Sequence, residues 1–369
     1  MKKLNLSKVL FYSLYTLIIF YYMCGKIVGI QPVRDIIFSI VPPSLIILIL
    51  FQSKKYNLKS LLIIVLLVLL TFVTYIITDS NELFLTLLFI IASKNIELDK
   101  LIKYDLFIKM ILTLMLFSLS GLGYTTDEIK YRNGVTRYSW GFGHPNALGA
   151  FLFSMCVDLI YLKGNKLKIK DYVFILVSFF ICTYVCNSRG AQLGIIIIVV
   201  LNLFYHKIKD NKLLKKMIPL IPTFCFILCL LFVIGYINNN ELSKLVNTIT
   251  SERIRMASEF YEYYGISLFG NRLEFLGMTD KSKYLTILDI SYLNILIQYG
   301  IIVTFIICIS FYNMLKKIIK NNKNEAIICI LAICMYGLME IYIFMIAYNA
   351  LLLYFGNMIY FKRNGGNEN

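Results

Sequence analysis

The sequence predicts an all-α, polytopic integral membrane protein with about 12 transmembrane helices and one long extracytoplasmic loop that carries amphipathic helices. Of its 369 residues, 59% are hydrophobic and only 16% are charged, whereas a soluble domain carries about 25% charged residues. Apolar runs of about 20 residues, the length that a bilayer core of about 30 Å requires, recur along the chain between short polar segments. A third observation, the distribution of basic residues, fixes the orientation.

The apolar runs define the expected helices in chain order. They lie at 7–29, 36–51, 58–78, 82–93, 101–121, 146–162, 170–186, 190–206, 217–237, 291–315, 325–340 and 342–361. The fourth run is short for a span and is equally compatible with a re-entrant helix. The last two runs meet near Glu340 and are also compatible with one long kinked helix.

Lysines cluster in every second connection, from Lys2 and Lys3 at the N-terminus to Lys362 near the C-terminus. The positive-inside rule then predicts an even number of spans in the inner or cytoplasmic membrane, with both termini cytoplasmic and 238–290 outside. We expect residues 1–369 to form a single transmembrane helical domain, with 238–290 as a loop subdomain. The net charge of +16 is spread over these short loops, so we expect the lipid bilayer and no nucleic acid as a partner.

Arginine shows an asymmetry that this topology does not require. Only Arg363 is expected inside; the seven others, expected on the outer face, are Arg34, Arg132, Arg137, Arg189, Arg253, Arg255 and Arg272. The arginine side chain presents a planar fork of donors that suits phosphate and carboxylate oxygens, and it stays charged at any biological pH. An anionic, phosphorylated ligand is therefore expected on the outer face.

Rare polar residues gather in the stretch from Arg137 to Asn146, which holds the only Trp and one of the two His. A structural interpretation is that Pro145 occupies the first helical position while His144 or Ser139 caps the helix. A functional interpretation is that Arg137 and the positive end of this helix bind an anion. Arg189 begins another helix on the same side, where its alternative role is an interfacial anchor.

In the loop at 238–290, the spacing of apolar residues predicts one or two amphipathic helices between Asn240 and Tyr264. We expect Ser251 to cap the second helix and Gly265 to end it. Within the apolar runs, Lys109 and Asp158 are expected to form a structural ion pair, because an unpaired charge is costly there.

Several motifs together resemble the Wzy-type polysaccharide polymerases of the O-antigen polymerase and ligase superfamily. They are Arg137 with Gly-Phe-Gly-His-Pro-Asn at 141–146, Asn-Ser-Arg-Gly at 187–190, Thr-Ser-Glu-Arg at 250–253, Leu-Phe-Gly-Asn at 268–271, Asp-Ile-Ser-Tyr-Leu at 289–293 and Tyr-Gly-Ile at 299–301. Two positions depart from the family's pattern: a Trp often found shortly after the loop Arg is absent, and Arg272 stands where Gly is common.

The resemblance implies a glycosyltransferase that joins oligosaccharide repeat units carried on polyprenyl pyrophosphate into capsular, O-antigen or exopolysaccharide at the outer face of the membrane. By analogy, the pyrophosphate would be held by Arg137, Arg189, Arg253 and Arg272. Partner proteins would be a flippase and a chain-length regulator.

The chemistry of glycosyl transfer requires stabilisation of the leaving group's charge and a base for the acceptor hydroxyl. Since the outer segments carry no Asp-x-Asp pair, we expect no metal ion or cofactor and assign the first task to fixed Arg charges such as Arg189. The base is His144, whose ordinary pKa is about 6.5, or a carboxylate: Asp280, Asp289 or Glu274. Alternative functions are an O-antigen-ligase-like transfer to another acceptor and, in a different class, a transporter or flippase of the lipid-linked unit.

Overall fold

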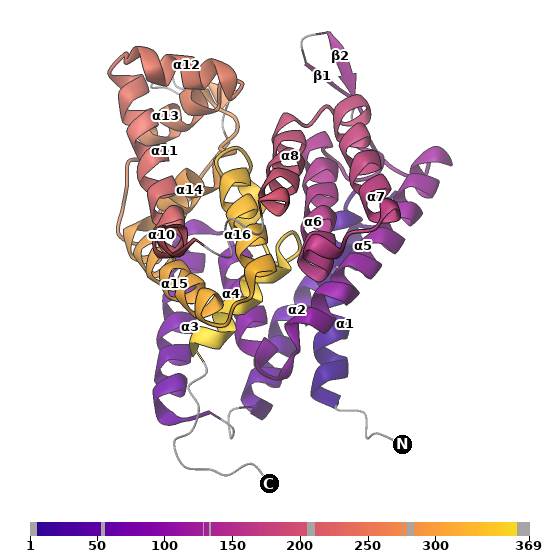
Figure 1. The fold of residues 1–369 in the computed structure, drawn as a ribbon, viewed down its shortest axis with the longest axis vertical. Coiled ribbons are helices and arrows are strands. Elements are labelled where there is room, and N and C mark those ends of the chain that lie inside the picture. The colour runs from indigo at the N-terminus through magenta and orange to yellow at the C-terminus, as the bar shows by residue number, and fades with distance from the viewer. Residues whose placement is uncertain are drawn as a thin grey trace. The chain divides into compact units, whose positions relative to one another are not determined.

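The structure is a computed structural model that describes residues 6–52, 56–127, 129–132, 134–204, 211–275, 277–278 and 284–359. Helices make up most of this part (Figure 1). The strands described in it form two short antiparallel ribbons: β1 (Lys130–Arg132) pairs with β2 (Val135–Arg137), and β3 (Gly277–Met278) pairs with β4 (Tyr284–Leu285). The predicted all-α class is confirmed.

Six helical segments of the described residues are long and apolar enough to cross a membrane. They are Leu6–Met23, Gln31–Gln52, Leu58–Thr78, Pro145–Lys166, Lys212–Ile237 and Ser291–Lys320. At about 1.5 Å per residue, such helices cover a bilayer core of about 30 Å. Apolar side chains on α3 (Leu58–Thr78), among them Leu62 and Leu66, are exposed on the protein surface. Exposed apolar faces of this length suit a lipid environment and not water.

Other expected spans are shorter. The α4 helix (Glu82–Ala92) has 11 residues, so at about 1.5 Å per residue it reaches only about half of the bilayer core. Shorter apolar helices also include α8 (Arg189–Leu203) and α16 (Asn324–Tyr336). The total of about twelve spans and the positions of the termini therefore stay predictions.

The expected continuous helix at 342–361 is wrong. This segment consists of a 3₁₀ helix at Ile341–Phe344, a turn, a second 3₁₀ helix at Ala350–Phe355 and the short α17 (Gly356–Ile359). The Asn349 side chain accepts a hydrogen bond from the Leu351 backbone N–H at 3.1 Å and so begins the second 3₁₀ helix. Residues 343–354 are all buried, which fits the rule that irregular backbone at membrane depth needs protein cover.

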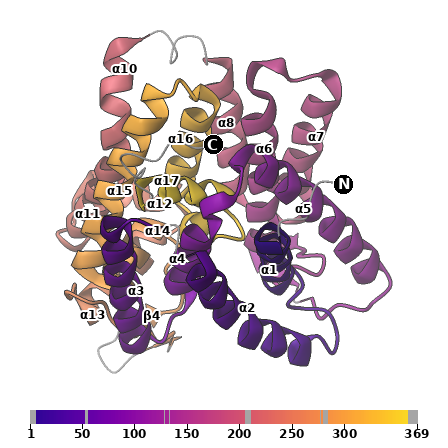
Figure 2. The same cartoon turned by 90° about the horizontal axis from the view of Figure 1, so that it is seen from below.

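The chain separates into two compact units. The first contains residues 1–67, 85–205 and 345–369. In it α1 (Leu6–Met23) packs against α2 (Gln31–Gln52), as Figure 2 shows, and α5 (Leu98–Gly121) packs against α6 (Pro145–Lys163). The α6 helix also packs against α8, and α7 (Ile169–Phe180), extended by a π-helix at Ile181–Val185, connects the two.

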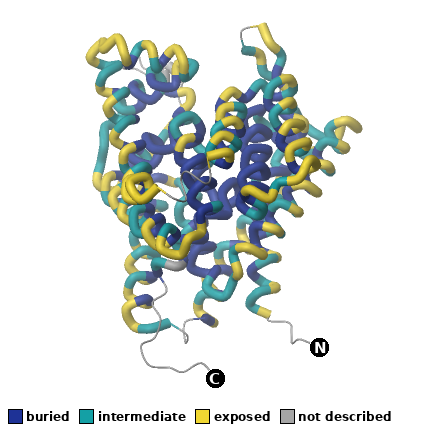
Figure 3. Tube along the Cα trace, viewed as in Figure 1, coloured by how far each residue is buried: buried dark blue, intermediate teal, exposed yellow. Residues whose placement is uncertain are grey.

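The α6 helix is the core of the first unit. Every residue from Pro145 to Tyr161 is buried (Figure 3). Pro145 occupies the first helical position, where its missing N–H costs nothing. Gly164, with a φ of 51°, ends the helix. A helix that is buried on all sides can hold a neighbouring loop in one place.

The expected ion pair of Lys109 is present, but its closest partner is different. Lys109 Nζ lies 2.6 Å from Asp105 Oδ2, one turn earlier on α5, and 3.9 Å from Asp158 Oδ2 on α6. Ser154 Oγ accepts a further hydrogen bond from Lys109 Nζ at 2.7 Å. These side chains are buried, so the cluster joins α5 to α6 by charge where water is absent.

The second unit contains residues 68–84 and 206–344. Its centre is α11 (Ile221–Ile237), which contacts α12 (Glu241–Ile249), α13 (Arg253–Tyr264) and α14 (Ser291–Asn294). After α14 the chain continues as a π-helix at Ile295–Tyr299 and then as α15 (Gly300–Lys320). The short α10 (Lys212–Met217) precedes α11.

The α12 and α13 helices lie where the sequence pattern predicts helices. Gly265 ends α13 with a φ of 65°, as expected, but the expected Ser251 cap is wrong, because Ser251 has a φ of 59° and Glu252 occupies the N-cap. On α12 the polar Ser243 and Asn247 are buried, while Leu242, Leu245 and Ile249 are exposed. An apolar stripe that faces outward suits a helix lying in the membrane interface.

Candidate functional site

Two helix N-termini meet in the first unit. The α6 helix begins at Pro145 and the α8 helix at Arg189. They pack so closely that a Cβ added at Gly149 would lie 2.7 Å from Ser188 Cβ and 2.9 Å from Ala191 Cβ. The positive dipole ends of both helices therefore lie in one region.

Arg137 ties the loop before α6 to this junction. Its guanidinium donates from Nε to the Cys186 carbonyl at 2.9 Å and from Nη2 to Asn146 Oδ1 at 2.6 Å. The neighbouring Tyr138 N–H donates to the Val185 carbonyl at 2.9 Å. Arg137 is buried, so it holds the loop, the start of α6 and the turn before α8 in one arrangement.

Arg132, on β1, reaches the same turn. Its Nη2 donates to the side-chain oxygen of Asn187 at 2.9 Å and also to the Asn187 carbonyl. Asn187 has a φ of 41°, a backbone conformation that Asn tolerates better than most residues. The turn that leads into Arg189 is thus fixed by two arginines. Arg189 itself is exposed at the first position of α8.

His144 caps α6, as the structural interpretation expects. Its Nδ1 accepts a hydrogen bond from the Asn146 N–H at 3.1 Å. A neutral imidazole whose Nδ1 accepts carries its proton on Nε2, so His144 is a hydrogen-bond donor at that atom. This geometry favours His144 as a donor to an anion and weakens its candidacy as the general base.

Sequence reasoning missed Asp127, which organises the loop before α6. Its carboxylate accepts hydrogen bonds from Ser139 Oγ at 2.6 Å, the Gly141 N–H at 2.6 Å, Ser120 Oγ at 3.0 Å and Thr125 Oγ1 at 3.1 Å. The signal was present, because Asp among Ser, Thr and Gly residues is typical of side-chain-to-backbone turns.

The second unit contains a buried charge cluster around Arg253, the first residue of α13. Arg253 Nη2 lies 2.7 Å from Glu340 Oε1, and Arg253 Nε lies 3.3 Å from Asp289 Oδ2. Burial by itself lowers the pKa of the Arg253 guanidinium, but the carboxylates of Glu340 and Asp289 outweigh burial and raise this pKa above its ordinary value. The Asp289 side chain remains 21% exposed, whereas that of Glu340 is 1% exposed.

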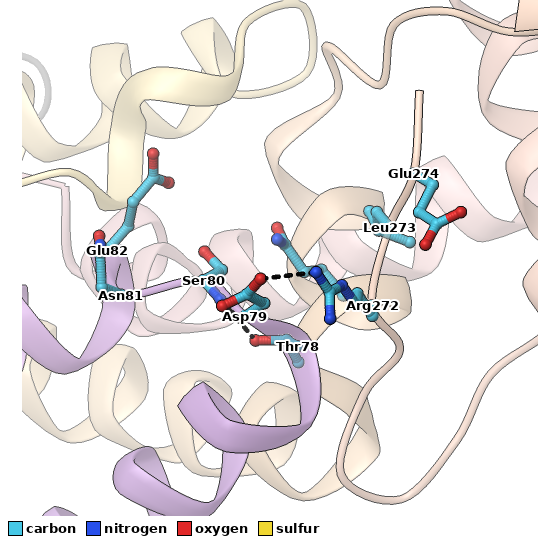
Figure 4. Close-up of a pocket in the computed structure, with 9 residues that line it drawn as sticks. Thr78, Asp79, Ser80, Asn81, Glu82, Arg272, Leu273 and Glu274 are labelled. Carbon is cyan, nitrogen blue, oxygen red and sulfur yellow. Dashed lines mark hydrogen bonds and ion pairs between the residues drawn. The ribbon is translucent and has the colours of Figure 1, made fainter. Parts of the chain in front are cut away.

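Arg272, the fourth predicted arginine, lies on a polar cavity of the second unit. Its Nη2 lies 2.8 Å from Asp79 Oδ2, and both side chains are more than half exposed (Figure 4). Glu82 and Glu274 also line this cavity. Glu82 begins α4, which is too short to span a membrane, and burial raises the pKa of its carboxyl to about 7.

The predicted site residues thus fall into two groups. Arg137, His144 and Arg189 belong to the first unit, while Arg253, Arg272 and Asp289 belong to the second. Arg253 and Asp289 are in direct contact, and Arg137 holds the turn before Arg189. The convergence of both groups on one cavity stays a prediction.

Asp280, an alternative base, lies outside the described residues. Among the described residues, no group of three or more His, Cys, Asp and Glu could hold a metal ion.

Comparisons of this chain with protein-family models, with curated proteins and with solved structures find no match. The function is therefore argued from these residues and their surroundings.

Proposed function

We propose that this chain is a membrane glycosyltransferase of the Wzy type, which polymerises oligosaccharide repeats carried on polyprenyl pyrophosphate at the outer face of the cytoplasmic membrane. The observation that carries the proposal is the junction of α6 and α8. There, the exposed Arg189, the His144 imidazole and two helix N-termini gather around a turn that Arg137 and Arg132 hold.

This junction suits a pyrophosphate leaving group. Negative charge develops on the pyrophosphate as its bond to the sugar breaks, and donors fixed in advance stabilise that charge most effectively. Arg189 offers two parallel N–H donors to phosphate oxygens. Nε2–H of His144 adds a further donor, and the positive dipole ends of α6 and α8 favour negative charge in this region. Fixed cations thus provide the stabilisation in this proposal, which needs no metal ion.

Arg137 and Arg253 have a different role in this proposal. Both are buried and already hold groups of the chain, so they position the site and do not bind pyrophosphate directly. Arg253 holds Asp289, whose partly exposed carboxylate is the better candidate for the base that accepts the proton of the attacking hydroxyl. Asp289 lies two residues before the buried helix α14, whose N-cap is Ile290.

Arg189→Lys tests this function in purified protein supplied with a lipid-linked repeat unit. Lys keeps the positive charge but cannot form the bidentate pair, so we expect a rate loss of about 30- to 1000-fold, the effect of about 2–4 kcal/mol at one transition-state contact. Products analysed by electrophoresis should then show single repeats without a polymer ladder.

The matched control is Arg255→Lys. Arg255 is partly exposed on α13 and forms ion pairs with Glu252 and Glu259, so its substitution should leave the ladder within about twofold of wild type, as for most solvated ion pairs. A full ladder at normal speed from Arg189→Lys would remove Arg189 from the catalytic site and return it to the role of an interfacial anchor.

A further inference from the structure

The polar cavity of the second unit has a volume of about 400 Å³, within the range typical of small-molecule sites. Three chain segments form it: residues 78–82 between α3 and α4, the extended residues 272–274, and Gln298 of the π-helix. Among the described residues that line it, Leu273 has the one apolar side chain. π-Helical turns such as Ile295–Tyr299 occur often at functional sites.

Close backbone packing fixes the walls of this cavity. Gly270, with a φ of 99°, lies against the π-helix, and a Cβ there would lie 1.9 Å from the Gln298 carbonyl oxygen. Asn271 donates from its backbone N–H to that same oxygen at 3.0 Å and from its side chain to the Ile297 carbonyl at 2.8 Å. Ser80 Oγ and Tyr299 OH are hydrogen-bonded at 2.7 Å, which joins residues 78–82 to the π-helix. The segment that carries Arg272 is therefore held in place before any ligand binds.

The charged groups in the cavity determine which chemical class of ligand it can bind. Asp79, Glu82 and Glu274 bring three carboxyl groups, and Arg272 brings one cation. Such a cavity disfavours pyrophosphate or any other strongly anionic group, because like charges would be brought together. Its carboxylates, side-chain amides, hydroxyls and guanidinium instead provide both acceptors and donors, the set that a polyhydroxylated ligand requires. Arg272 therefore differs from the other arginines that were predicted to bind pyrophosphate.

We propose that this cavity binds the acceptor sugar of a lipid-linked repeat unit as a non-anionic saccharide, with Arg272 and Asp79 as its principal hydrogen-bonding residues. This inference rests on the proposed function, since it assigns a second subsite to the same reaction. The pyrophosphate of the donor binds at the α6–α8 junction, while sugar hydroxyls bind in the cavity.

The test uses the oligosaccharide released by mild acid from the lipid-linked repeat that accumulates in cells lacking this chain. Binding of this free oligosaccharide to the purified full chain in lipid nanodiscs is measured by calorimetry. We expect Arg272→Gln to weaken binding at least tenfold, and Arg189→Lys and the surface control Arg255→Gln to leave it within twofold. Inorganic pyrophosphate, added as a competitor, should not displace the oligosaccharide.

Three results would overturn the inference: no binding to the wild-type chain, equal affinity in Arg272→Gln, or displacement by pyrophosphate. The polymer ladder, measured on the same preparations, separates this inference from the proposed function. A normal wild-type ladder without binding of the free oligosaccharide refutes the acceptor subsite alone. Binding lost in Arg272→Gln, together with an absent wild-type ladder, refutes the polymerase function and leaves the saccharide site standing.

Discussion

Two arginines of the second unit, Arg253 and Arg272, were both predicted to bind pyrophosphate but differ in the structure. Each lies in the segment expected outside the membrane, and each contacts carboxylates at hydrogen-bonding distance. The Arg253 side chain is 9% exposed, whereas that of Arg272 is 64% exposed. Burial, not residue type, therefore decides which arginine stabilises the fold and which is available to a ligand.

The energetic consequence follows from desolvation. A charged group that is buried away from water is stabilised mainly by its ion-pair partners. Removing one partner of a buried pair leaves the other charge buried without compensation, which destabilises the fold. An exposed pair is solvated whether or not it forms, so it contributes little. The same difference separates Arg137, which is buried at the α6–α8 junction, from Arg189, which is exposed there.

The largest expected effect is that of Arg253→Met. Removing this cation leaves Glu340 buried beside an apolar side chain, and we expect a loss of about 3–5 kcal/mol in the free energy of unfolding. Thermal unfolding in detergent measures this loss, with Arg255→Met as the partly exposed control on the same helix. The double variant Arg253→Met with Glu340→Leu should recover most of the stability, because an apolar pair often replaces a buried ion pair at little cost. Wild-type stability in the single variant would contradict the comparison.

An intermediate effect is expected from Asn146→Ala at the α6–α8 junction. The substitution removes the acceptor of the 2.6 Å hydrogen bond from Arg137 Nη2, and hydrogen bonds to charged groups contribute about 1.5–3 kcal/mol. Thermal unfolding in detergent again provides the measurement. Asn146→Asp is the matched control: it keeps an oxygen for Arg137 and adds a negative charge at a helix N-terminus, so it should retain wild-type stability. If both variants lost stability equally, the Arg137 bond would not be the cause.

Local signals predicted much of the fold. Pro145 at the start of α6, Arg189 at the start of α8 and Gly265 at the end of α13 lie where the sequence predicts, because each depends on the residue's own backbone preferences. The break in the last helix could not be predicted in this way, since its turn lies within a continuous apolar run. Apolar runs give the length of a buried segment and not its hydrogen-bonding pattern.

The ion-pair partners of the charged residues were harder to predict than the positions of the helix ends. Glu340 lies 87 residues from Arg253, and no periodicity in a single sequence relates the two. The same is true of the ion pair between Asp79 and Arg272, which also joins residues far apart in the sequence. Asp105, in contrast, lies one helical turn before Lys109, and the i, i+4 spacing alone could have identified it as the closer partner. Long-range ion pairs follow from the tertiary fold, so the candidate site could be predicted only as a set of residue types.

The smallest expected effect on stability is that of Arg272→Gln. Its pair with Asp79 joins two side chains that are both more than half exposed, so the substitution should change the free energy of unfolding by about 0–1 kcal/mol. Added salt should reduce even this difference, because exposed charges are screened over about 10 Å at 0.1 M ionic strength. Asp79→Asn should behave in the same way, and the double variant should give a coupling energy within the same range.

Unfolding of these variants at low and high salt checks the prediction, and a loss of several kcal/mol would mean that Arg272 supports the fold as Arg253 does. A near-zero loss is also what makes Arg272→Gln a usable binding variant, since weaker saccharide binding can then be assigned to the cavity and not to unfolding.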